Sequence, residues 1–228
     1  MTARLDARLK AIADFVPIGS RVADIGTDHA QLAIELIKSG RASKVIAADK
    51  NEGPLDAARK NIAAAGLNDR IETRLGDGLK VIRADEVDAV CIAGMGGALI
   101  AEILSDGVEN SIEHLILQPM NAVERVRHRL ALNGWIVIDE DLAEVGGIVY
   151  EIICAGRADR STAVEMTKRS QSPLLKKLLN DRIDKLKKIL SAMEKSPSAV
   201  NSQKYLQLRA ALERQVFDRD RRIGAASD

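Results

Sequence analysis

Aromatic residues are scarce in this sequence: Phe, Tyr and Trp together make up 2% of the 228 residues. The core must therefore be built from Ala, Val, Ile and Leu, within a hydrophobic fraction of 46% that is normal for a globular protein. Stacking of bases on aromatic side chains is excluded as a main means of recognition if the partner is a nucleic acid. The chain is long enough for one sizeable α/β domain and a small additional module.

Long apolar runs are also missing. No segment approaches the roughly 18 consecutive apolar residues that a membrane-spanning helix needs. The N-terminal segment carries charges throughout and has no apolar signal region. We therefore expect neither membrane insertion nor secretion, and we predict a cytoplasmic protein.

Cysteine and histidine are too few and too scattered for a metal or nucleophile site. Cys91 and Cys154 each lie in an apolar run typical of a buried strand, so we predict structural roles for both. The three histidines, His29, His114 and His128, do not have ligand spacing on one face, and no metal is expected. No Ser, His and Asp arrangement for nucleophilic catalysis stands out.

Charge is divided unevenly along the chain, although the net charge is only +1. Residues 173–222 contain 13 Lys and Arg against 6 Asp and Glu, which leaves 21 basic and 27 acidic residues for the remainder. A basic module attached to an acidic body indicates a polyanionic partner for that module.

Strand-like and helix-like segments alternate over residues 1–157. Apolar strands are expected at 21–26, 43–49, 70–75, 87–94 and 114–119, and helices at 4–16, 29–40, 52–66 and 122–134. This alternation predicts an α/β fold with a doubly wound, mostly parallel sheet. Residues 135–156 read as strand, turn and strand, an antiparallel hairpin at the end of the sheet.

Residues 158–228 have a different character and are predicted to form a linker and a basic helical hairpin. An apolar stripe at helical spacing marks its first helix, through Leu175, Leu178, Leu179, Ile183, Leu186, Ile189, Leu190 and Met193. A second helix follows a break at 196–202. Six basic side chains of the first helix are candidates for contact with RNA phosphates: Lys176, Lys177, Arg182, Lys185, Lys187 and Lys188. The alternative is a solvated helix face.

The loop after the first strand, ADIGTDHAQL at 23–32, has the residues of a ligand loop. Gly26 permits a close backbone approach, but the further glycines of a dinucleotide fingerprint are missing. Its acidic residues suit a ligand with cationic ends, such as the sulfonium and ammonium of S-adenosylmethionine. Asp28 is alternatively the N-cap of the next helix.

Three further loops follow the carboxyl ends of successive strands, where ligands bind in open α/β sheets. Asp49 ends the second strand and is suited to accept hydrogen bonds from ribose hydroxyls. Asp77, between two glycines in LGDGL, is suited to an adenine 6-amino group, or is simply part of a turn. The sequence IAGMGG at 92–97 opens a helix after a buried strand, with backbone amides available to a target base or an anion.

These segments, DIGTDHAQL, ADKNEGP, GDGL, IAGMGG and LQP in this order, resemble the bacterial tRNA (adenine(22)-N1)-methyltransferase family, called TrmK, over nearly the whole chain. The resemblance implies a Rossmann-like class I methyltransferase, S-adenosylmethionine as cofactor and a tRNA substrate, acting as a monomer. The implied cofactor-binding residues are Asp24, Gly26, Thr27, Asp28, His29, Asp49, Lys50, Asn51, Asp77, Gly78, Ala93, Gly94 and Gly96. The implied catalytic residues are Asp28, Ile92, Gly94 and Met95, where carbonyls and a carboxylate would stabilise the cationic product.

Other functions remain open at this point. The substrate is alternatively another RNA, a protein or a small molecule, or the protein is a tRNA-binding scaffold with a vestigial pocket. A nicotinamide oxidoreductase is disfavoured by the missing glycine fingerprint.

Overall fold

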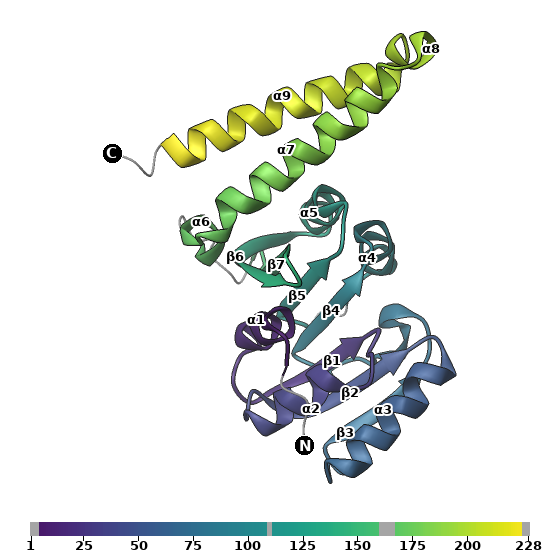
Figure 1. Cartoon of the computed structure of the whole chain (residues 1–228). Coiled ribbons are helices and arrows are strands. Elements are labelled where there is room, and N and C mark those ends of the chain that lie inside the picture. The colour runs from purple at the N-terminus through teal and green to yellow at the C-terminus, as the bar shows by residue number, and fades with distance from the viewer. Residues whose placement is uncertain (1–4, 109–110, 160–166, 225–228) are drawn as a thin grey trace. The chain divides into compact units, whose positions relative to one another are not determined.

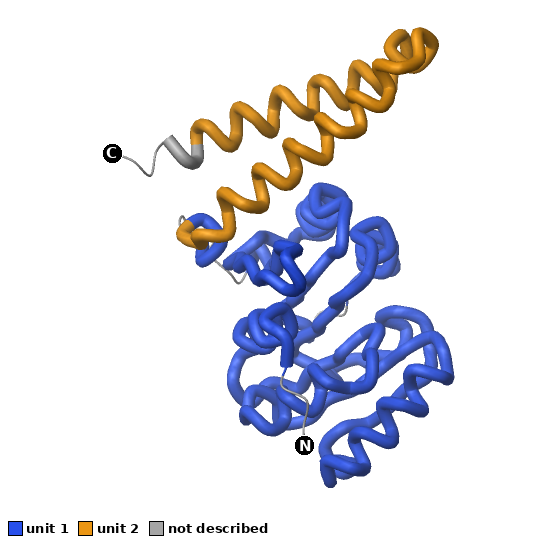
Figure 2. Tube along the Cα trace, in the orientation of Figure 1, with its two compact units in different colours: residues 1–170 blue, residues 171–228 orange. Residues whose placement is uncertain are grey.

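The computed structural model describes residues 5–108, 111–159 and 167–224. The chain divides into two compact units, residues 1–170 and 171–228 (Figure 2). The first unit thus extends beyond residue 157, where the sequence analysis placed its end. The short helix α6 (Lys168–Gln171) begins within it, and Arg169 donates from Nε to Glu151 Oε2 at 3.0 Å.

A seven-stranded sheet forms the centre of the first unit, in the order β3-β2-β1-β4-β5-β7-β6 (Figure 1). Its strands are β1 (Ser20–Ile25), β2 (Ala42–Asp49), β3 (Ile71–Leu75), β4 (Ala89–Met95), β5 (His114–Pro119), β6 (Trp135–Val145) and β7 (Ile148–Arg157). The first five pair in parallel, and β7 is antiparallel to both β5 and β6. The expected mostly parallel sheet with an antiparallel end hairpin is confirmed.

Helices cover both faces of this sheet. One apolar layer contains residues of α1 (Ala7–Phe15), α2 (Gln31–Lys38) and α3 (Glu52–Ala64). The other contains residues of α4 (Gly97–Ile103) and α5 (Val123–Leu132), beside the 3-10 turns η1 (Gly78–Val81) and η2 (Leu104–Asp106). Strand β4 contributes to both layers, because Cys91 points into the first and Ile92 into the second.

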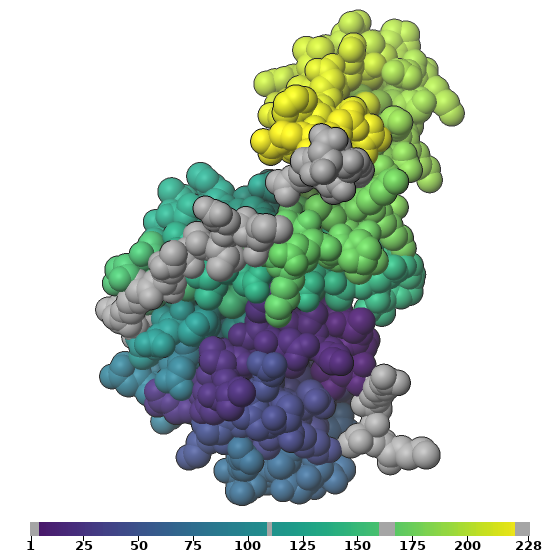
Figure 3. Space-filling view, turned by 90° about the vertical axis from the view of Figure 1, so that its left-hand side faces the viewer, coloured from purple at the N-terminus to yellow at the C-terminus, as the bar shows by residue number. Residues whose placement is uncertain are grey.

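The start of the N-terminal helix α1 is fixed by its N-cap residue, Asp6. Asp6 Oδ1 accepts a hydrogen bond from the Leu9 amide at 2.8 Å, which satisfies one of the free amides of the first turn. The helix buries Ile12 and packs on β6, β7 and α2. In Figure 3 the purple atoms of the N-terminal residues lie between teal and blue segments of the first unit. Helix α1 thereby brings residues from the start of the chain to the middle of the sheet.

The second unit consists of α7 (Leu174–Met193), the one-turn helix α8 (Pro197–Val200) and α9 (Gln203–Gly224). Helices α7 and α9 pack together as the predicted hairpin, and Tyr205 donates from its hydroxyl to Glu194 Oε1 at 3.0 Å near the turn. The apolar stripe is largely buried, but the prediction for Ile189 was wrong: it is 37% exposed. Its neighbour Leu190 takes the buried position, and one residue's step turns Ile189 about 100° away.

Cys91 and Cys154 are free and buried, in agreement with the structural role predicted for both. Burial raises the pKa of the Cys154 thiol to about 12, and it raises that of Cys91 as well. Both side chains are therefore neutral thiols near pH 7 and poor nucleophiles. Within the described ranges, no helix is long and apolar enough to cross a membrane, and no group of side chains is suited to hold a metal ion.

Gly97, the first residue of α4, lies in close contact with the backbone of the loop after β5. A Cβ atom at this position would lie 2.4 Å from the Asn121 carbonyl oxygen and 2.7 Å from that of Ala122. We expect Gly97→Ala to lower the free energy of unfolding by about 1–3 kcal/mol, because the start of α4 must move away from this loop. Urea denaturation measures the change.

Gly53 provides the matched control, since it lies in the first turn of α3 with open space around it and an ordinary backbone conformation. Gly53→Ala should leave stability unchanged or raise it by about 0.4–1 kcal/mol. Equal unfolding midpoints for Gly97→Ala and the unaltered protein would contradict the proposed steric role.

Candidate functional site

A cleft lies where the neighbouring strands β3, β2, β1 and β4 reach their carboxyl ends. Its empty space of about 410 Å³ is continuous with open solvent. Its lining residues are Ile25, Gly26, Ala48, Asp49, Lys50, Asn51, Gly76, Asp77, Gly78, Met95, Leu99 and Ile103.

Hydrogen bonds to β2 hold the loop after β1 in place. The amides of Gly26 and Thr27 both donate to the Ala48 carbonyl, at 2.8 and 2.9 Å. Gly26 has φ +75°, and a Cβ at this position would lie 2.0 Å from Met95 Cε. The left-handed φ favours glycine here, and Met95 lies directly against its bare backbone in the cleft.

Asp24 lies at the end of β1 and is almost fully buried, with 5% exposure. Its Oδ2 accepts a hydrogen bond from the Thr27 hydroxyl at 2.8 Å. Burial raises the pKa of Asp24 to about 6, the Thr27 hydrogen bond opposes this rise, and the nearby charge of Asp49 adds to it. A carboxyl group placed in this way is ready to change its charge when a cation approaches.

Asp28 does not cap the following helix, so that alternative was wrong. Helix α2 begins after Ala30, and no side chain caps it, because His29 and Ala30 both adopt left-handed backbone conformations at φ 55°. The Asp28 side chain is 83% exposed and pairs with His29 Nε2 at 3.2 Å. Neither residue is part of the cleft lining, and their contact with a ligand stays a prediction.

The acid at the end of β2 has a fixed orientation. Asp49 Oδ1 accepts hydrogen bonds from the Asn51 amide at 2.8 Å and from Asn51 Nδ2 at 3.2 Å. Asp49, Lys50 and Asn51 all line the cleft, as the sequence analysis expected for the ribose side. A carboxylate held at a strand end can accept hydrogen bonds from a ribose diol.

Next to the end of β2, the loop after β3 supplies the second acid of the cleft. Asp77 and Gly78 both line it, together with Gly76, which the sequence analysis had not singled out. The Gly76 amide donates to the Asp49 carbonyl at 3.0 Å, so the two acidic loops are tied together. Lys80 lies near Asp77, with 3.8 Å between its Nζ and Asp77 Oδ2, and forms a closer ion pair with Asp106.

The glycine loop after β4 bends away from the sheet at Gly94. The register of β4 with β5 shifts between Ala93 and Met95, and Gly94 has φ +75°. Bulges of this kind re-aim backbone groups next to active sites. Gly94 donates from its amide to Gln118 Oε1 at 3.1 Å.

Two residues that sequence reasoning missed complete this region. Gln118 is fully buried, and Arg8 donates from Nη1 to the same Gln118 Oε1 at 2.8 Å. A polar residue at the end of an apolar strand was the available signal for Gln118. Arg8 gives no local signal, because it is one of several charges on an amphipathic helix. The two are separated by 110 positions in the chain.

The structure thus separates the predicted site residues into groups. Those that line the cleft together are Gly26, Asp49, Lys50, Asn51, Asp77, Gly78 and Met95. Asp24 and Thr27 form a buried pair behind the loop, while Gly94 and Gly96 lie beside Gln118 and Asn121. Ile92 and Ala93 lie within the β4 ladder, paired with Leu117 and Gln118.

Comparison with known proteins connects this site to an enzyme family. A family model described as a methyltransferase domain matches residues 5–153. Over 164 residues the chain is 41% identical to the tRNA (adenine(22)-N(1))-methyltransferase of Bacillus subtilis, an alignment that covers 71% of this chain and 69% of that protein. The chain belongs to the tRNA (adenine(22)-N1)-methyltransferase family.

Two solved structures of similar proteins contain the cofactor or its product. TrmK of M. capricolum, in complex with S-adenosyl-homocysteine, has a TM-score of 0.81 at 26% identity and covers 96% of this chain and 99% of that chain. Sp1610 of Streptococcus pneumoniae, in complex with S-adenosyl-L-methionine, has a TM-score of 0.74 at 32% identity and covers 92% and 100%.

The residues of the cleft fit such a cofactor. Two carboxylates, Asp49 and Asp77, line the cleft together with the bare backbone at Gly26, and acceptors of this kind suit a ribose diol and an exocyclic amine. Asp24 supplies a further carboxyl group next to the β1 loop. The cleft of the methyltransferase is therefore acidic and glycine-lined, which suits this cofactor.

Cofactor affinity should depend on the charge of Asp24. Because its pKa is raised to about 6, the carboxyl group is neutral at lower pH, where we expect it not to attract the ammonium group of the cofactor. We expect the affinity for S-adenosyl-homocysteine to fall as the pH is lowered through about 6. Asp24→Asn should bind weakly and without this pH dependence, as measured by calorimetry.

The same raised pKa sets the sign of the effect on folding. An Asp whose folded-state pKa lies above its unfolded value reduces stability as the pH rises between the two, so Asp24→Asn should stabilise the ligand-free protein near pH 7. Asp14→Asn, at an exposed acid paired with Arg41, is the control and should change neither property. A pH-independent affinity in the unaltered protein would refute the role of Asp24.

Proposed function

We propose that this protein transfers the methyl group of S-adenosylmethionine to N1 of adenine 22 in tRNA. The observation that carries the proposal is the cleft itself, with Gly26, Asp49 and Asp77 at the ends of three adjacent parallel strands. The support for this substrate is the 41% identity to the B. subtilis enzyme that is named for it.

Each side of the cleft is assigned one part of the cofactor. Asp49, with its orientation fixed by Asn51, accepts the ribose hydroxyls. Asp77 accepts the adenine 6-amino group. The buried pair Asp24 and Thr27 lies on the methionine side, where a carboxylate attracts the ammonium group.

The reaction depends on alignment of the methyl group with adenine N1 more than on acid or base catalysis. The cofactor supplies a methyl group on a sulfonium, which is already activated for transfer. Adenine N1 has a free lone pair, so no residue must remove a proton from it. Met95 lines the cleft on the β4 side and the bulged Gly94 directly precedes it, so the two can orient the incoming base. Such positioning contributes about 7–11 kcal/mol in favourable cases.

The product base carries a positive charge, so nearby carbonyls and carboxylates stabilise it. The candidates remain the backbone carbonyls from Ile92 to Gly94 and the Asp28 carboxylate. Because N1 belongs to the Watson–Crick edge, the adenine must be unpaired or flipped out before it can react.

We assign tRNA binding to the second unit. Lys176, Lys185, Lys187 and Lys188 are exposed on α7, whereas Lys177 and Arg182 are half-buried. With so few aromatic residues, recognition must depend on phosphate contacts rather than stacking. The monomeric state and the cytoplasmic location stay predictions.

The substrate assignment is tested with unmodified tRNA. After reaction with S-adenosylmethionine, nucleoside mass spectrometry of fragments should place 1-methyladenosine at position 22. A transcript with G in place of that adenine should accept no methyl group. Methylation of both transcripts, or of neither, would overturn the proposed substrate.

The basic face of α7 should supply much of the electrostatic attraction to tRNA. We expect replacement of Lys185, Lys187 and Lys188 by Ala to weaken tRNA binding and to lower the slope of log K against log salt by about 2–3, since fewer counterions are released. Fluorescence anisotropy over a salt series measures both quantities.

A matched triple variant in the first unit controls for net charge. Lys38, Lys44 and Lys60 are exposed as well but lie on α2, β2 and α3. Their replacement by Ala should leave the salt slope nearly unchanged. Equal slopes for both triple variants would remove the α7 face from the interface with tRNA.

A further inference from the structure

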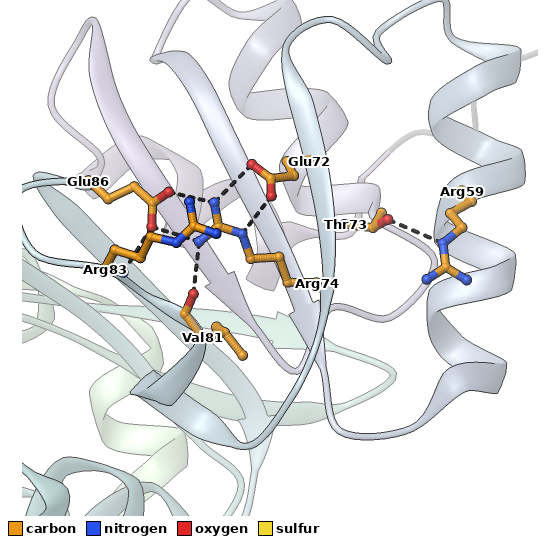
Figure 4. A network of polar contacts seen from close by, with 7 residues as sticks. All are labelled: Arg59, Glu72, Thr73, Arg74, Val81, Arg83 and Glu86. Carbon is orange, nitrogen blue, oxygen red and sulfur yellow. Dashed lines mark hydrogen bonds and ion pairs between the residues drawn. The ribbon is translucent and has the colours of Figure 1, made fainter.

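Arg74 on β3 makes a complete set of hydrogen bonds around the loop that forms one wall of the cleft (Figure 4). Its Nε and Nη2 donate to the two Glu72 oxygens at 2.7 and 2.9 Å. Nη2 and Nη1 donate to the two Glu86 oxygens at 2.5 and 2.6 Å, and Nη1 also donates to the Val81 carbonyl at 2.8 Å. All five donors of the guanidinium are thus occupied.

These bonds close the connection between β3 and β4 into a fixed loop. Val81 ends the turn η1 in the middle of the connection, and Glu86 lies near its far end. Glu86 Oε2 also accepts a hydrogen bond from the Arg83 amide at 2.9 Å. One side chain on β3 therefore fixes both the middle and the end of this loop.

The Val81 side chain transmits this constraint to the cleft. A Cβ at Gly76 would lie 2.4 Å from Val81 Cγ1, so Val81 packs directly on the Gly76 backbone. Gly76, Asp77 and Gly78 are consecutive residues of the cleft lining. A Cβ at Gly78 would in turn lie 3.2 Å from Cγ2 of Ile103, another lining residue. A shift of Val81 would therefore move the segment that carries Asp77.

The network is partly protected from water and is charged throughout the physiological range. The Arg74 side chain is 12% exposed and that of Glu86 is 23% exposed. The hydrogen bond with Arg74 lowers the pKa of Glu86 to about 2, and the pKa of Arg74 is raised by Glu86 and Glu72. Loss of Arg74 would leave the Val81 carbonyl and the Glu86 carboxylate without these bonds.

We propose that Arg74 is a positioning residue for cofactor specificity, which holds Asp77 where it recognises the adenine 6-amino group. Arg74 is not part of the cleft lining, so it acts through the loop. The inference rests on the assignment of Asp77 to adenine in the proposed function.

A purely structural role would lower stability without changing which nucleoside is preferred. The readout is therefore the ratio of affinities for S-adenosyl-homocysteine and S-inosyl-homocysteine, in which an oxygen replaces the 6-amino group. The inosine analogue presents an acceptor to the Asp77 carboxylate, and two acceptors cannot form a hydrogen bond. We expect the unaltered protein to prefer the adenosine compound by about tenfold or more.

Calorimetry with both compounds on Arg74→Met, Arg74→Lys and Arg59→Met tests the inference, after circular dichroism has verified folding. Met has a similar length but no donors, and Lys offers a charge without the planar fork. Both Arg74 variants should reduce the preference to within about threefold, since the loop is no longer fixed.

Arg59 is the matched control, because it also pairs with two acids, Glu52 and Asp56, and donates to Thr73 Oγ1 beside Arg74 (Figure 4). Its bonds do not reach the loop between β3 and β4, so Arg59→Met should retain the preference of the unaltered protein.

The outcomes separate the two proposals. If the unaltered protein binds both compounds equally, the assignment of Asp77 to adenine fails, and this inference falls with it. If the unaltered protein discriminates and a folded Arg74 variant discriminates equally well, the role of Arg74 is overturned while the proposed function stands. Should Arg74→Met not fold, the milder Arg74→Lys decides.

Discussion

The parallel pairing of β1 with its neighbours β2 and β4 is the constraint on which the rest of this structure depends. Parallel strands end at the same edge of a sheet, so the loops that follow them must meet there. The bonds from Gly26 and Thr27 to the Ala48 carbonyl, and from Gly76 to the Asp49 carbonyl, continue the pairing beyond the strands. The cleft is the direct consequence of this extended register.

Charged side chains have a different role in each of the two units. In the first unit, carboxylates lie in and behind a cleft whose residues suit a cofactor with cationic ends. Asp24 is the extreme case, because its burial disfavours the very charge that a bound ammonium group would favour. In the second unit, exposed lysines on α7 suit a polyanion. A single net charge of +1 conceals both specialisations.

Buried or half-buried polar side chains control the glycine-rich loops, which have few side-chain contacts of their own. Gln118 accepts from the Gly94 amide and from Arg8, and so connects the N-terminal helix with the bulge in β4. Arg74 has the same relation to the loop of Asp77 through the Val81 carbonyl. Small residues permit close approach to a ligand, and distant side chains supply the rigidity that small residues lack.

The sequence by itself determined the elements of the sheet and the acids at their ends. Hydrophobic periodicity and strand-end chemistry are local, so Asp49 and Asp77 were identified without coordinates. Only the tertiary structure decided that Met95 lies against Gly26, that Gln118 meets Arg8, and that Asp28 leaves its helix uncapped. The reason is physical: these contacts depend on the strand order and on left-handed backbone conformations, which no periodic pattern encodes.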